Sequence, residues 1–226
     1  MARLYLVRHS QASFGMENYD QLSELGYKQS AYIPKHFEDT VLNKIDAFYR
    51  GDMLRHKQTS EHSFSNATPT IIPGLNEFNH ESVLHVHRPE IADKEKAMAL
   101  IMNQSDPKKF MEDEFDLAMN KWMDEEGPSA YAESFKHFKE RCLNSLNQII
   151  TTSRKEKHKE VVAITSGGVI SLLVAHILDL PQSKYTGLNT IIANTSVSCL
   201  LFNDHKITLR YFNNYSHLPK EMVTFF

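Results

Sequence analysis

Two arginines, a histidine and a carboxylate stand where they could act together on an anion. Arg8 and His9 follow the apolar run LYLV, Arg55 opens the segment LRHKQTSE, and Glu77 follows TIIPGLN. Guanidinium groups match phosphate oxygens, an imidazole is a nucleophile, and a carboxyl group can protonate a leaving oxygen. Together these residue types predict phosphoryl transfer through a phosphohistidine.

A fourth segment, Ser166-Gly167-Gly168, follows the apolar run EVVAIT and opens a nearly all-apolar stretch. Bare backbone N–H groups at a helix N-terminus attract anions, so this segment fits a phosphate site. Each feature also has a structural interpretation: an Arg-His pair after a strand, a loop carboxylate, and glycines that let a helix pack close to a sheet. The functional hypothesis therefore depends on a fold that brings the segments together.

The order of the expected elements provides such a fold. Strands are expected at 3–7, 45–49, 160–165 and around 70, and a hairpin is expected around an Asn-Asp turn near the end of the chain. One helix begins after Ser23 and ends before Pro34, and another covers 54–64. The alternation predicts a three-layer α/β protein whose mostly parallel central sheet, with an antiparallel edge strand, is flanked by helices. The carboxyl ends of parallel strands share one edge, so the four segments should converge there.

The middle of the chain, about residues 89–153, is expected to be helical. A face of one helix is marked by apolar residues at helical spacing: Phe135, Phe138, Cys142, Leu146 and Ile149. No linker separates this region from the rest. We therefore expect a single domain over 1–226, with the helical part as an excursion that covers the active-site end of the sheet.

Composition excludes several classes of protein. The chain has 226 residues, of which 41% are hydrophobic and 23% charged, which is ordinary globular composition. A net charge of −3 gives no basic footprint for nucleic acid, and the apolar runs are shorter than the roughly 18–20 residues of a membrane helix. Cys142 and Cys199 make no metal or redox spacing. We expect a cytoplasmic protein with no metal, cofactor, nucleic-acid or membrane partner, and a homodimer stays open.

Six segments in order resemble one family over most of the chain. LVRHSQA resembles the signature LVRHGE/Q of the histidine phosphatase superfamily, whose members are phosphoglycerate mutase-like. The other similar segments are DQLSELGYKQS, LRHKQTSE, LNEFNHE, AESFKHFKER and NNYSHL.

The resemblance implies a role for each of these residues. His9 would attack phosphorus, while Arg8, Arg55, Gly167 and the hydroxyl of Ser166 would bind the phosphoryl oxygens. Glu77 would protonate the leaving oxygen and then help water to attack the phosphohistidine. It must be protonated for the first task, so a raised pKa or an optimum below neutral pH is expected. The substrate would be a small phosphorylated molecule.

The sequence departs from the family's pattern at several places. Ser166 stands where the family has a second histidine, and losing one such donor to the phosphate costs about 10²–10³ in rate. His80 and His217 are candidates to replace it. Ser10 replaces a glycine, and its side chain could narrow the site. Gly15 stands where mutases have a phosphate-binding asparagine.

Two further histidines and an arginine have weaker signals. His85 and His87 alternate in LHVHR and would share one face of a strand, but they lack visible partners for a metal. Arg88 could meet a substrate tail.

The function predicted from the sequence is a phosphatase with weak or narrow activity, in which Ser166→His should raise the rate. The alternative is a catalytically impaired protein of the same fold that binds phosphate or a phospholigand. A phosphosugar mutase is disfavoured, because the excursion lacks a basic pair for a second phosphate. Outside the family, the alternative is a sheet-based anion-binding or regulatory protein. An enzyme needs His9 and Glu77, whereas a binding protein tolerates Glu77→Gln.

Overall fold

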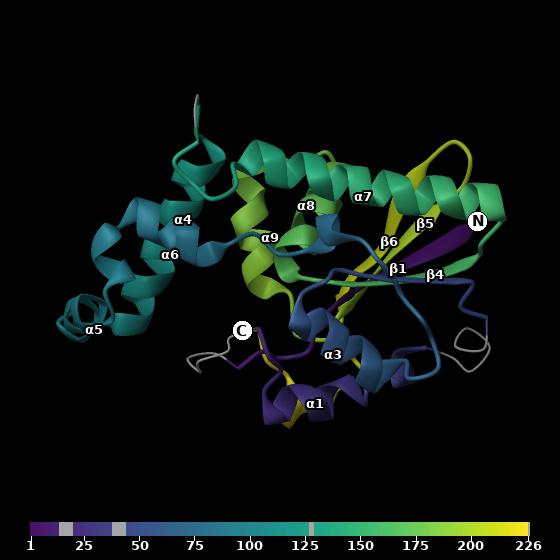
Figure 1. The fold of residues 1–226 in the computed structure, drawn as a ribbon, viewed down its shortest axis with the longest axis horizontal. Helices are drawn as coiled ribbons and strands as arrows, with labels where there is room; N and C mark the ends of the chain where they lie inside the picture. The colour runs from purple at the N-terminus through teal and green to yellow at the C-terminus, as the bar shows by residue number, and fades with distance from the viewer. Residues whose placement is uncertain (14–19, 38–43, 127–128, 226) are drawn as a thin grey trace. The chain divides into compact units, whose positions relative to one another are not determined.

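The computed structural model describes residues 1–13, 20–37, 44–126 and 129–225, which form two compact units. The first unit comprises Met1–Glu77 and Arg141–Phe226, and the second comprises Phe78–Glu140. The second unit is thus an insertion in the sequence of the first. The central sheet belongs to the first unit (Figure 1).

The sheet has six strands in the described part of the chain. In sheet order they are β3 (Thr70–Ile71), β2 (Ala47–Arg50), β4 (Glu160–Thr165), β1 (Ala2–Arg8), β5 (Val197–Phe202) and β6 (Ile207–Asn214). The first four are mutually parallel, and β5 runs antiparallel to both β1 and β6. The predicted α/β class and the terminal hairpin are confirmed. The antiparallel strand is the inner strand of that hairpin, and β6 forms the edge.

The two central strands have the sequences expected of a buried parallel sheet. In β1 and β4 the runs LYLV and VVAI are buried on both faces, since parallel strands are covered by helices on both sides. Their register pairs Tyr5 with Val162 and Val7 with Ile164. The same register carries Arg8 to the end of β1 beside Thr165 at the end of β4.

Helices cover both faces of the sheet in the first unit. Figure 1 shows α1 (Glu24–Ser30) and α3 (Leu54–Ser63) on one side, and α8 (Gly167–Ile177) and α9 (Tyr185–Ile191) on the other. Ser23 caps α1 by accepting the N–H of Gly26 at 3.0 Å. Pro34 follows in the short 3₁₀ turn η1 (Ile33–His36), so both predicted ends of this helix are confirmed.

The remaining helix of the first unit is shared with the second. Helix α7 (Phe135–Glu156) begins in the second unit and belongs to the first from Arg141 onward. The apolar positions predicted for its inner face, from Phe135 to Ile149, are all buried. None of the helices in the described ranges is long and apolar enough to cross a membrane.

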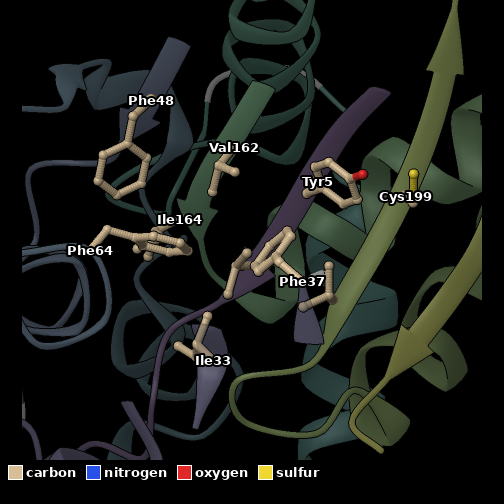
Figure 2. Close-up of a cluster of buried hydrophobic side chains, with 10 residues drawn as sticks. Tyr5, Ile33, Phe37, Phe48, Phe64, Val162, Ile164 and Cys199 are labelled. Atoms are coloured by element: carbon tan, nitrogen blue, oxygen red, sulfur yellow. The ribbon is translucent and has the colours of Figure 1, made fainter. Parts of the chain in front are cut away.

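A cluster of buried side chains joins η1 and the end of α3 to the sheet (Figure 2). The sheet contributes Tyr5, Val7, Phe48, Val162, Ile164, Val197 and Cys199, and the helical layer contributes Ile33, Phe37 and Phe64. The ring of Phe64, directly after α3, meets Phe48 and Phe37 edge to face at centroid distances of 5.1 and 5.8 Å. This packing fixes α3, which carries Arg55, against the sheet.

The second unit is helical and has its own core. It contains α4 (His80–His87), the 3₁₀ turn η3 (Pro89–Ala92), α5 (Lys94–Met102), α6 (Pro107–Met123) and the start of α7. Phe78, Phe135 and Phe138 surround the ring of Trp122, whose Nε1–H donates to the carbonyl of Glu133 at 2.8 Å. These rings are the apolar core of the unit.

One interpretation of this region is wrong. His85 and His87 lie on helix α4 and not on a strand, because Asn79 caps a helix there by accepting the N–H of Ser82 at 2.9 Å. Arg88 is bonded within the unit to the buried carboxylate of Glu114, through two contacts of 2.6 Å. His87 adds a third contact to that carboxylate at 3.0 Å.

Truncating the ring that ties α3 to the sheet should cost much of the protein's stability. We expect Phe64→Ala to lower the free energy of unfolding by about 3–5 kcal/mol, the usual effect of removing a buried aromatic ring. Urea unfolding followed by circular dichroism measures it. The matched control is Ile71→Ala, at a position with 49% exposure, which should change stability by about 0.5 kcal/mol or less. Equal effects of the two substitutions would contradict the packing described above.

Candidate active site

The predicted convergence of the strand ends is present in the structure. Arg8 and Arg50 end β1 and β2, and Ser166 directly follows β4. The loop that carries Glu77 follows β3 and is tied to the end of β4, because Thr165 Oγ1 donates to the carbonyl of Leu75 at 2.6 Å. One edge of the sheet therefore gathers residues from four separate parts of the chain.

The ring of His9 is held in one tautomer by its two partners. Its Nδ1 lies 2.7 Å from the carbonyl oxygen of Ser10, which can only accept, so Nδ1 carries the proton. Its Nε2 lies 3.1 Å from Nε of Arg55, which can only donate, so Nε2 presents a lone pair. A lone pair on Nε2 is what a nucleophilic histidine requires.

The surroundings of His9 also keep its ring neutral. Burial, followed by the nearby positive charges of Arg55 and Arg8, holds the pKa of His9 well below its ordinary value of 6.5. The residue is only 6% exposed. A neutral imidazole at physiological pH is ready to attack without first losing a proton.

Arg55 is held in turn by Asp20, a residue that the sequence did not single out. Nη1 of Arg55 donates to Oδ1 of Asp20 at 2.8 Å, and Oδ2 of Asp20 accepts the N–H of Leu54 at 2.7 Å. Asp20 thereby caps the N-terminus of α3 and orients the guanidinium that follows it. In the sequence, the only sign of a role for Asp20 was its place in DQLSELG, part of a segment that resembles the family.

Arg8 approaches the start of helix α8. Its Nη1 donates to the carbonyls of Ile192 and, at 2.8 Å, Phe225. A side chain at Gly167 would place its Cβ 3.5 Å from Nε of Arg8 and 3.0 Å from Oδ1 of Asn189. The absence of a side chain at Gly167 thus lets the helix N-terminus, with its positive dipole end, lie beside the guanidinium.

The segment after His9 is bonded to α1. Oγ of Ser10 lies 2.7 Å from Oγ of Ser30, and the backbone N–H of Gln11 donates to Oε1 of Gln29 at 2.9 Å. A Cβ at Gly26 would overlap the carbonyl of Gln11. The hydroxyl of Ser10, expected to narrow the site, is instead used to join the nucleophile's segment to this helix.

Glu77 lies against α8, and Arg141 holds its loop. Oε2 of Glu77 accepts the N–H of Gly168 at 2.9 Å. From α7, Nη1 of Arg141 donates to the carbonyls of Gly74 at 3.1 Å and Asn76 at 2.6 Å, and Nη2 donates to that of Glu77 at 3.4 Å. The proposed acid therefore has a fixed backbone.

Ser166 faces a histidine that sequence reasoning missed. Its Oγ lies 2.7 Å from Nε2 of His56, a fully buried residue on α3. The rings of His56 and His9 lie 5.6 Å apart, centroid to centroid. Burial first, then Arg55 and Arg50, holds the pKa of His56 well below 6.5. The only hint in the sequence was that the resembling family has alanine after the second arginine.

His217 and His80 are the other candidates for the missing second histidine. Nε2 of His217 lies 3.3 Å from Oγ1 of Thr195, and burial together with His36 lowers the pKa of His217 to about 4. It reaches the nucleophile only through Thr195, whose backbone N–H donates to the carbonyl of His9 at 3.3 Å. His80 begins α4 in the second unit, and Gly15 lies outside the described residues.

The site is rich in positive charge. Arg8, Arg50 and Arg55 come from three elements around it, and Nη1 of Arg50 donates to the carbonyl of Gly51 at 2.8 Å. Within the described ranges, no group of three or more histidines, cysteines, aspartates or glutamates could hold a metal ion. Guanidinium groups and a helix N-terminus are instead suited to a dianionic phosphate.

Comparisons with known proteins agree with this chemistry. Residues 4–215 match the family model of the histidine phosphatase superfamily, branch 1. No curated protein matches the sequence.

Three solved structures show the same fold at low sequence identity. A phosphoserine phosphatase from Entamoeba histolytica is 16% identical, with a TM-score of 0.67, over 97% of this chain and 100% of that one. An alpha-ribazole phosphatase from Shigella flexneri is 19% identical, with a TM-score of 0.62, over 94% and 96%. A mycobacterial glucosyl-3-phosphoglycerate phosphatase is 18% identical, with a TM-score of 0.63, over 97% and 100%.

The buried neutral histidines should make the protein less stable in acid. His9 and His56 have lowered pKa values when folded, so below about pH 6.5 the unfolded chain binds protons that the folded chain does not. The free energy of unfolding should therefore fall between pH 7.5 and 5.5, by up to about 1.4 kcal/mol per pH unit for each histidine. Urea unfolding in phosphate-free buffers measures this slope.

The variant His9→Asn isolates the contribution of His9. It should show a shallower fall in stability over the same pH range. A slope equal to that of the unaltered protein would mean that His9 is not held neutral.

Proposed function

This chain belongs to the histidine phosphatase superfamily, branch 1, and we propose that it hydrolyses a phosphate monoester through a phosphohistidine on His9. The observation that carries the proposal is the pair of contacts at His9, with Ser10 O at Nδ1 and Arg55 Nε at Nε2. They support the neutral tautomer that attacks phosphorus.

The first half-reaction transfers the phosphoryl group to the protein. The N–H on Nε of Arg55 turns from Nε2 of His9 to a phosphoryl oxygen, and the freed lone pair of Nε2 attacks phosphorus as the bond from phosphorus to the ester oxygen breaks. Arg8, Arg55 and the N–H of Gly167 bind the phosphoryl oxygens, where negative charge is stabilised. Glu77 gives its carboxyl proton to the leaving oxygen, so the alcohol departs neutral.

The second half-reaction restores the protein. Water attacks phosphorus and gives a proton to Glu77 as the bond between phosphorus and Nε2 breaks. Inorganic phosphate leaves, His9 regains its lone pair, and Glu77 is protonated for the next turnover. No group beyond water and the substrate is consumed.

The named structural neighbours support a class of substrate, but they do not point to any particular leaving group. They are named for phosphoserine, alpha-ribazole and glucosyl-3-phosphoglycerate, which differ widely beyond the phosphate. The substrate class that these names have in common is a phosphate monoester of a small molecule. The positive charge of this site fits the same class. The second candidate, a phosphate-binding protein with little turnover, is favoured by Ser166 alone.

Hydrolysis of p-nitrophenyl phosphate without added metal tests the proposal. From about pH 4.5 to 8, we expect turnover that His9→Ala abolishes and Glu77→Gln lowers by about 10²–10⁴-fold in kcat. Acid-labile phosphate should be trapped on the unaltered protein and not on His9→Ala. No His9-dependent turnover, with phosphate still raising Tm, would favour the binding protein.

The hydrogen bonds from Arg141 to the Glu77 loop should matter for turnover and not only for folding. Arg141→Lys keeps the charge but cannot span the carbonyls of Gly74 and Asn76, so kcat should fall about tenfold or more as the acid loses its position. The matched control is Arg154→Lys on the same helix, where Nε and Nη2 of Arg154 both donate to the carbonyl of Asn203. Steady-state kinetics measure kcat. An equal fall in kcat for both variants would contradict a role of Arg141 that is specific to Glu77.

A further inference from the structure

The hydroxyl of Ser166 is not used as its position in the fold would suggest. Ser166 is the N-cap residue of α8, where a serine side chain normally accepts an N–H from the first turn. It makes no such bond, because Oε2 of Glu77 accepts the N–H of Gly168. The hydroxyl instead contacts Nε2 of His56 at 2.7 Å, and both residues are fully buried.

The ring of His56 fits a space that the surrounding residues leave for it. A Cβ at Gly51 would overlap the imidazole ring and also Oδ1 of Asn76, so the ring fits only because residue 51 has no side chain. Oδ1 of Asn76 in turn accepts the N–H of Asp52 at 3.0 Å. Burying an imidazole costs folding free energy unless its polar atoms make hydrogen bonds. The contact between His56 and Ser166 therefore matters for the burial of His56.

The proton on His56 can be assigned from its partners. Burial and the two arginines keep the pKa of His56 well below 6.5, so the ring has one N–H. Its Nδ1 is buried and makes no hydrogen bond within the described residues. A buried N–H without a partner is rarer than a buried acceptor without one, so the proton belongs on Nε2, which donates to Ser166 Oγ.

That assignment fixes the direction of the serine hydroxyl. With Oγ of Ser166 accepting from His56, its own proton must point away from the imidazole. The rings of His56 and His9 lie side by side at 5.6 Å, so the pair stands beside the nucleophile. A phosphoryl group on His9 would be an acceptor for this proton.

Building on the proposed function, we infer that His56 is a positioning residue, which orients the Ser166 hydroxyl to donate a hydrogen bond to the phosphoryl group at His9. The serine touches the phosphate, and the histidine acts through the serine. The pair thus supplies the donor that the resemblance assigns to one histidine at position 166.

The test compares four variants in two measurements. The variants are Ser166→Ala, His56→Leu, His56→Gln, which keeps a donor near the position of Nε2, and the double variant Ser166→Ala/His56→Leu. The measurements are kcat and KM on p-nitrophenyl phosphate, and the Kd of inorganic phosphate by calorimetry. Circular dichroism and urea midpoints identify variants that fail to fold.

We expect Ser166→Ala and His56→Leu each to lower kcat by about 10²-fold, with a smaller change in KM. Each should weaken phosphate binding by about tenfold. The double variant should be no worse than the poorer single one, because the residues act as a unit. His56→Gln should recover most of the loss.

Several results would overturn the inference. One is a Ser166→Ala protein with unchanged kcat and phosphate affinity, and this small substitution is informative even if His56→Leu does not fold. Another is a double variant whose loss is the product of the two single losses. If the unaltered protein shows no His9-dependent turnover, the proposed function fails, and phosphate affinity in the same variants still decides the role of the pair. Absence of both turnover and phosphate binding would overturn both.

Moving the histidine from position 56 to position 166 gives an independent check. His56 already contacts Ser166 Oγ, which argues against the expectation from the sequence that Ser166→His raises activity. We expect Ser166→His alone to be slower than the unaltered protein, and His56→Ala/Ser166→His to be faster than Ser166→His. A gain in activity from Ser166→His alone would contradict the proposed arrangement.

Discussion

A guanidinium group can only donate hydrogen bonds, and Nε of Arg55 lies 3.1 Å from Nε2 of His9. With the carbonyl of Ser10 at Nδ1, this contact leaves the imidazole a single neutral tautomer. Much of the first unit serves to keep that contact in place. Asp20 orients Arg55 from the loop before α1, and the packing of Phe64 holds the helix that carries Arg55 against the sheet.

The same arrangement has a cost in folding free energy. Arg50 and Arg55 are nearly fully buried, His56 has a ring nitrogen without a hydrogen bond in the described structure, and Thr195 has a φ of 63°, which is strained for a β-branched residue. Strained and buried polar groups of this kind cluster at functional sites. The phosphate of the proposed function would place negative charge beside the two arginines. Binding sites often sacrifice stability in this way.

The sequence predicted the parts of the site that follow from local pattern. Arg8, His9 and Ser166 directly follow apolar runs, so their place at the strand ends could be read from the chain. Asp20, His56 and Arg141 could not be assigned their partners, because those contacts join residues 35, 110 and 67 positions apart. In LHVHR, three alternating positions were too few to separate a strand from a helix, and the cap at Asn79 decided in favour of the helix.

The contact between Arg141 and the carbonyl of Glu77 joins the last residue of the first unit before the insertion to the first residue after it. The chain therefore leaves the first unit and re-enters it at one hydrogen-bonded point. A segment whose two ends are already pinned together adds little closure entropy when its length changes. Insertions and deletions within the second unit should therefore cost the first unit little in closure entropy, which leaves the length of this unit free to vary during evolution.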